Sequence, residues 1–118
     1  MAKDQVNEKY KDAKGMKWDG GKLRWDLLDL ETLEPIVNRF TRGAEKYGPN
    51  NWRLVDDAKE RYYAALMRHL CEYRKGNRDD DDPRFADYPS HLAAALWNGL
   101  CLLWFENQER KAEKKGNK

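Results

Sequence analysis

Hydrophobic residues recur at helical spacing in three segments of the chain, and no long run alternates polar and apolar residues as a strand would. A repeat near 3.6 residues is typical of an amphipathic helix. Pro35 suits the opening turn of the first segment, and Gly76 suits the end of the second. We therefore predict an all-α fold with three main helices, over residues 32–47, 57–75 and 90–114.

The first of these helices has two distinct faces. One is apolar, the other polar, and a helix of this type buries the apolar face against the rest of the fold. The apolar positions are Leu33, Ile36, Val37, Phe40, Ala44 and Tyr47. The polar positions are Glu34, Asn38, Thr41 and Glu45.

The third helix is apolar around its whole circumference. It reads SHLAAALWNGLCLLW from Ser90 to Trp104, and Asn98 is the one polar side chain between His91 and Glu106. A helix apolar on all sides must be buried on all sides, yet a chain of 118 residues has two other helices to cover it. We expect a bundle of three main helices that is completed by oligomerisation, with a second copy of the chain covering the third helix.

The length is that of one domain. We expect a flexible basic arm over residues 1–16, an all-α domain over 17–108 and a charged tail over 109–118. The 23 basic and 21 acidic residues nearly cancel, so no overall field favours nucleic acid or a membrane as partner. The five tryptophans are expected mainly in the core.

The cysteines and the termini favour a cytoplasmic protein. Cys71 and Cys101 lie in apolar helical runs without a Cys-x-x-Cys motif, and we expect both to be buried, reduced thiols. The first twenty residues lack the apolar core of a signal peptide. The apolar run over residues 92–105 is shorter than the roughly 20 residues that span a bilayer.

Several kinds of chemistry are excluded by missing motifs. The glycines between Gly15 and Lys22 have the wrong spacing for a phosphate loop, and Leu23 stands where that loop needs Ser or Thr. There is no His-Asp dipeptide, no nucleophilic Ser at an elbow and no Cys-His zinc spacing. What remains is a set of carboxylates and imidazoles that a helical bundle could gather around Mg²⁺, which prefers oxygen ligands.

Each of these groups also has a purely structural interpretation. Glu45 and Glu72 could be solvated or paired on a helix surface, and Asp79 to Asp82 could form a solvated loop. His69 could be a core histidine, and His91 could only cap its helix. Asn98 either locks the helix packing or faces a polar pocket, because a buried amide needs partners.

Four blocks of sequence together resemble a known family. They are DGGKLRWDLL from Asp19, GAEKYGPNNW from Gly43, RYYAALMRHL from Arg61 and HLAAALWN from His91. In this order they resemble the phage proteins described as the N-terminal domain of dATP/dGTP diphosphohydrolases, over residues 17–105. The resemblance implies cleavage of purine deoxynucleoside triphosphates to monophosphate and pyrophosphate. It also implies an affinity with the all-α, Mg²⁺-dependent, MazG-like pyrophosphohydrolases.

With this resemblance, each candidate residue receives a role. His69, His91 and Glu72 are the expected catalytic residues, and the metal, Mg²⁺ or else Mn²⁺, is expected on carboxylates. The expected metal ligands are Glu45, Glu72, Asp79 and Asp82. The expected substrate contacts are Lys22, Lys46 and Arg68 on the phosphates, and Asn51, Trp52 and Asn98 on the base or sugar.

An alternative function uses the same fold without catalysis. The protein would then bind a nucleotide, a nucleic acid or a host protein. MazG-like enzymes carry a Glu-x-x-Glu on one helix and a Glu-x-x-Asp on a later one, but here no helical Glu-x-x-Asp follows the Glu-x-x-Glu of residues 31–34. In addition, Ala94 stands where similar phage proteins commonly have a second histidine. Both departures from the family pattern favour the non-catalytic alternative.

Overall fold

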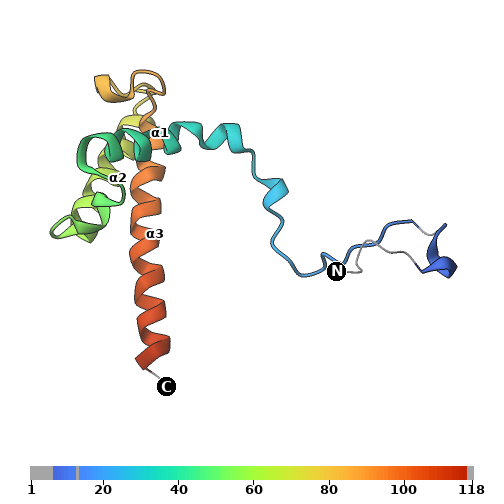
Figure 1. Ribbon diagram of the computed structural model, residues 1–118. Helices are drawn as coiled ribbons and strands as arrows, with labels where there is room; N and C mark the ends of the chain where they lie inside the picture. Colours follow the sequence, from blue (N-terminus) through green and yellow to red (C-terminus); the bar gives the residue numbers. More distant parts are fainter. Residues whose placement is uncertain (1–6, 13, 117–118) are drawn as a thin grey trace.

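The computed structural model describes residues 7–12 and 14–116, and the regular structure in this part of the chain is entirely helical. Its three long helices are α1 (Leu30–Tyr47), α2 (Ala58–Arg74) and α3 (His91–Gly116), joined by loops with short 3₁₀ turns (Figure 1). The predicted all-α fold with three main helices is confirmed. The expected arm and tail lie partly outside the described residues.

Local capping explains where α1 and α3 begin. Asp29 accepts hydrogen bonds from the backbone N–H and the hydroxyl of Thr32, so α1 begins two residues earlier than predicted. Pro35 consequently lies in the second turn of α1, not in its first turn as predicted. Ser90 caps α3 as expected, since its hydroxyl oxygen accepts from the N–H of Ala93 at 2.9 Å.

The α2–α3 pair is the main contact of the fold, and α1 crosses its upper end (Figure 1). Cys101, which is fully buried, lies at the centre of the core beside Tyr62 and Ala58 of α2. Aromatic rings from α1, the α1–α2 loop and α3 pack around this centre, namely Phe40, Trp52, Trp97 and Phe105.

One chain does not cover α3 completely. Leu96, Leu100 and Leu103 form a half-exposed stripe along α3. A second half-exposed stripe, of Tyr63, Met67 and Leu70, lies along α2. The expectation that α3 is buried on every side is therefore not met within a single chain.

Two burial predictions were wrong. Trp18 and Trp25 are 80% and 73% exposed, because the segment before α1 runs away from the helices (Figure 1). Cys71 is exposed on α2, whereas Cys101 is buried as predicted. Apolar neighbours in the sequence do not bury a residue when its own position lies on the outer side of the helix. None of the described helices has the length and apolar character needed to cross a bilayer.

Candidate functional site

A cleft of about 1000 Å³ lies between the second half of α1, the α1–α2 loop, α2 and α3. Its walls are largely aromatic. The rings of Phe40 and Trp97 lie 5.5 Å apart, those of Phe40 and Trp52 5.9 Å, and those of Tyr62 and Trp97 5.7 Å. The Tyr62 hydroxyl donates to the carbonyl of Trp52 at 2.6 Å and so ties the loop to α2. The cleft therefore has rigid, apolar walls suited to a flat ring.

The charged residues that line the cleft are mostly basic. They are Arg39, Arg61, Arg84 and Glu45, and Arg39 and Arg84 are already paired with Asp80 and Asp82. Glu45 is already paired with Arg42, at 2.6 Å. Among the described residues, Arg61 forms no ion pair with a carboxylate. The cleft is therefore suited to a ligand that carries negative charge.

Two buried donors at the cleft have no partner among the described residues. They are Nε of Arg39, whose side chain is 7% exposed, and Nε1 of Trp97. A buried donor left without an acceptor costs free energy.

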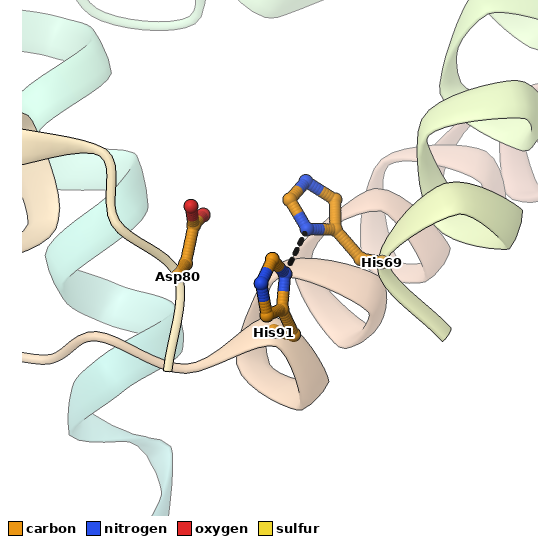
Figure 2. A group of neighbouring side chains, drawn as sticks. All are labelled: His69, Asp80 and His91. Atoms are coloured by element: carbon orange, nitrogen blue, oxygen red, sulfur yellow. Dashed lines mark hydrogen bonds between the residues drawn. The ribbon is translucent and has the colours of Figure 1, made fainter. Parts of the chain in front are cut away.

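Two histidines meet beside the cleft, where α2 lies next to the start of α3 (Figure 2). His69 comes from the middle of α2 and His91 is the first residue of α3. Their Nδ1 atoms lie 3.0 Å apart, and Asp80 from the α2–α3 loop approaches both rings. The ligand atoms of these three side chains lie within 4.8 Å of one another. We call this group the imidazole cluster.

The α2–α3 loop is tied back so that it carries Asp80 to the histidines. The N–H of His91 donates to the carbonyl of Arg78 at 3.0 Å. Asp80 accepts from Nη2 of Arg39 at 2.9 Å and from the N–H of Asp82 at 3.2 Å. Arg39 also donates to the carbonyl of Ser90 at 3.3 Å. The loop is thus anchored to α1 and to the start of α3.

Burial and charge shift the pKa values at this cluster. Burial lowers the pKa of His69 from its usual value, and the positive charge of Arg39 lowers it further although Asp80 opposes the shift. Burial alone would raise the pKa of Asp80, but the hydrogen bonds from Arg39 and Asp82 outweigh it and the pKa is lowered. At neutral pH the cluster therefore contains an ionised carboxylate beside a neutral His69 imidazole.

The cluster separates two hollows. His69 lines the aromatic cleft, whereas His91 lines a second hollow of about 930 Å³. Glu72 and Asp79 also line this second hollow. A group bound between the two imidazoles would therefore be reachable from both sides.

The structure divides the predicted site residues among these places. The cleft contains Glu45, Asn51, Trp52, His69 and Asn98. The second hollow contains Glu72, Asp79 and His91. Neither hollow contains Lys22, Lys46, Arg68 or Asp82.

Asn98 lies at the cleft and is hydrogen-bonded within its own helix. Its side chain is 5% exposed and lines the cleft. Its amide also donates to the carbonyl of Ala94, one turn earlier, at 2.8 Å. Trp52 lines the cleft as well, but its ring packs edge-on against Trp104 at 5.3 Å.

The four carboxylates predicted to hold Mg²⁺ are not brought together in the described part of the chain. Each has a local partner of its own. Glu45 pairs with Arg42, Glu72 accepts from Asn77, Asp79 pairs with Arg78, and Asp82 pairs with Arg84. The residues present therefore do not fit a cation held by this carboxylate set.

Arg39 was not predicted as a site residue, and Asp80 was not singled out from the run Asp79 to Asp82. Both are buried, and together they connect α1, the α2–α3 loop and the imidazole cluster. A signal for Arg39 was present, because it is a charged residue between the apolar Ile36 and Phe40. Asp80 gave no such signal, because it is one of four consecutive aspartates.

These observations define a class of protein: an all-helical domain with a cleft lined by aromatic and basic residues and a pair of histidines beside it. The chain belongs to the family described as "dATP/dGTP diphosphohydrolase, N-terminal", whose model matches residues 12–115. A dATP/dGTP diphosphohydrolase of Salmonella phage PMBT28 is 32% identical over 93 residues, which cover 79% of this chain. The matched part is 30% of that relative, so the chain spans about a third of its length. No solved structure matches the chain.

Proposed function

We propose that this domain binds a purine deoxynucleoside triphosphate in the aromatic cleft and takes part in its hydrolysis to monophosphate and pyrophosphate. The observation that carries the proposal is the combination, in one cleft, of aromatic rings and arginines, among which Arg61 forms no ion pair in the described part of the chain. Membership of a family named for dATP/dGTP diphosphohydrolases supports this substrate class.

The proposal assigns the two ends of the nucleotide to different parts of the cleft. The base would lie against the aromatic wall near Trp52 and Asn98, where rings and amide groups are available. The phosphates would lie near Arg61 and Arg84, because one guanidinium group can donate two parallel hydrogen bonds to the oxygens of a phosphate. These arginines replace Lys22, Lys46 and Arg68, which lie outside the cleft.

Direct assay of hydrolysis tests the proposal. The purified chain would be incubated with each of the four deoxynucleoside triphosphates, with Mg²⁺ or Mn²⁺, and the products separated by ion exchange. We expect dAMP or dGMP together with pyrophosphate. If no nucleotide yields monophosphate with either ion, the claim of hydrolysis is wrong for this chain.

Arginine variants test the position of the phosphates. Arg61→Ala should weaken nucleotide binding by about 10- to 100-fold, since a hydrogen bond to a charged group contributes roughly 1.5–3 kcal/mol. Arg74→Ala is the matched control, because Arg74 is an exposed arginine of α2 that does not line the cleft. Equal loss of binding in both variants would place the phosphates elsewhere.

Glu72 is proposed as a catalytic residue that acts from the second hollow. Its side chain lies beside His91 in this hollow and accepts a hydrogen bond from Asn77 at 2.6 Å. Glu72→Gln should abolish turnover and leave the helix content unchanged by circular dichroism. Full activity of this variant would remove Glu72 from the site.

A second candidate function is nucleotide binding without turnover. One observation favours it: Ala94 leaves α3 with one histidine, where similar phage proteins commonly have two. In this case calorimetry would detect saturable binding of dATP or dGTP in samples that form no product. Nucleic-acid binding would show instead as an affinity that falls steeply with salt.

We also propose that the domain works as a homodimer or homotetramer. The half-exposed stripes on α2 and α3 are the surfaces that a second copy would cover. Leu100→Lys should lower the molar mass in light scattering toward that of one chain, 14.0 kDa. Leu54→Lys, at a 77% exposed leucine outside both stripes, should leave the mass unchanged.

A further inference from the structure

We infer that His69, Asp80 and His91 form a binding site for a divalent first-row transition-metal ion, distinct from the carboxylate site for Mg²⁺ expected from the sequence. Binding of the ion stands on the geometry of the cluster alone. Its participation in hydrolysis rests on the proposed function.

The spacing of the two imidazoles is the first argument. Zinc and similar ions bind imidazole nitrogen at about 2.0–2.1 Å, so two neighbouring ligands at a right angle lie about 3.0 Å apart. The Nδ1 atoms of His69 and His91 are separated by 3.0 Å. Without an ion, two facing ring nitrogens at this distance need a proton between them, whereas an ion would accept a lone pair from both.

Asp80 supplies the third ligand. One of its oxygens lies within 4.8 Å of the ligand atoms of both histidines. Neighbouring ligand atoms on one ion lie about 3.0 Å apart at a right angle and about 3.3–3.4 Å apart at the tetrahedral angle. To complete the site, the Asp80 oxygen would therefore have to move closer to the histidines by up to about 1.8 Å.

The donor set selects the type of ion. Two imidazoles and one carboxylate suit Zn²⁺, Mn²⁺, Fe²⁺ or Co²⁺, whereas Mg²⁺ favours carboxylates and retained water. Three protein ligands also leave at least one position open, as in zinc sites that act in catalysis. Because His69 lines the cleft and His91 the second hollow, a phosphate oxygen or water could reach the ion.

The surrounding contacts hold Asp80 in place. Arg39 donates to Oδ2 of Asp80, and the side chains of Arg39 and Asp80 are 7% and 10% exposed. The other oxygen, Oδ1, accepts from the N–H of Asp82. A carboxylate oxygen can accept more than one hydrogen bond or ion, so these contacts orient Asp80 and leave it able to bind.

Cobalt titration of the metal-free protein tests the site. Untagged chain would be treated with a chelator, returned to buffer and titrated with Co²⁺ while the visible absorption is recorded. We expect saturation at one ion per chain, displacement by Zn²⁺, and no displacement by a hundredfold excess of Mg²⁺. Absence of saturable uptake would overturn the inference, as would displacement by Mg²⁺ as readily as by Zn²⁺.

Variants locate the ion. His69→Gln and His91→Gln should each weaken binding at least tenfold, because each removes one of three ligands. Glu72→Gln and Asp79→Asn are the controls, as carboxylates of the adjacent hollow, and should bind as the wild type does. Wild-type affinity in the histidine variants would overturn the site, and so would an equal loss in the controls.

A measurement on the wild type remains decisive even if the histidine variants fail to fold. The chain has two histidines, so the untagged protein gives two sets of imidazole signals in NMR spectra. Substoichiometric Mn²⁺ should broaden both sets before other signals. Early broadening of carboxylate-rich segments, with the imidazole signals unchanged, would overturn the inference.

These titrations contain no nucleotide, so they separate the metal site from the proposed function. Uptake of one Co²⁺ without any turnover of nucleotides would leave the site standing and refute the hydrolysis. Turnover with Mg²⁺ and no uptake of Co²⁺ would support the hydrolysis and refute the transition-metal site.

Discussion

The ion pair between Arg39 and Asp80 is the contact whose loss should cost the fold most. The two side chains are 7% and 10% exposed, and the guanidinium lies 4.0 Å from the centre of the Phe85 ring. Asp80→Ala leaves the Arg39 charge buried with the carbonyl of Ser90 as its remaining acceptor. Removing one member of a buried pair typically costs about 3–5 kcal/mol, a large share of the roughly 5–15 kcal/mol that stabilises a domain.

A double-mutant cycle in urea measures this effect. The cycle contains Asp80→Ala, Arg39→Met and the double variant, with a chelator present so that no ion contributes. Methionine keeps most of the contact with Phe85, and the double variant has no unpaired charge. We therefore expect the double variant to lose at least about 2 kcal/mol less than the sum of the two single losses.

The exposed pair Arg42–Glu45 provides the reference. Its side chains are 38% and 59% exposed, and a pair of this type is worth about 0–1 kcal/mol. Glu45→Ala should therefore cost much less than Asp80→Ala. If the two variants lose the same free energy of unfolding, the reasoning that burial makes the Arg39–Asp80 pair critical is refuted.

Three further predictions concern the cysteines, alkaline pH and two glycines. A thiol reagent should label exposed Cys71 in the native protein and leave Cys101 unlabelled, because burial excludes the reagent and raises the pKa of the Cys101 thiol to about 12. Burial also raises the pKa of Tyr62 from 10.0 to about 12. The stabilising contribution of the neutral Tyr62 is therefore fully present below pH 10 and is lost as the pH rises through about 12. A urea midpoint that stays constant over this pH range would contradict the prediction. Gly43→Ala, inside α1, should raise the free energy of unfolding by about 0.5–1 kcal/mol. Gly76→Ala should lower it by about 1 kcal/mol or more, because Gly76 has φ +96°; equal effects of the two glycine variants would be inconsistent with this.

The sequence was sufficient to predict the helices, because their signals are local. The hydrophobic period, Ser90 as a cap and Gly76 as a stop act within a few residues, and the structure places them as predicted. The path of the segment before α1 was not predictable in this way. Trp18 and Trp25 are apolar, but no local signal states whether apolar residues pack on their own domain or remain exposed.

The candidate site was predictable only in part, for a related reason. His69 and His91 stood out because they are the two histidines of the chain. Asp80 did not stand out among its acidic neighbours, and its burial depends on Arg39, which lies 41 residues away in the sequence. Tertiary contacts decide which of several identical side chains in a loop is buried at the site, and these contacts cannot be read from the sequence pattern.

In helix α1 the residues that are buried differ from those that the hydrophobic pattern predicts. Val37 and Tyr47 belong to its apolar face but are 55% and 56% exposed, whereas Asn38 and Arg39 are buried. The buried face is therefore rotated away from the face that hydrophobicity alone would select. Burying a guanidinium group instead of a valine side chain lowers the stability of the fold. Such a loss of stability is expected where the buried residue serves the function of the protein. Arg39 has such a function, since it donates to Asp80, whose carboxylate lies close to the two histidines.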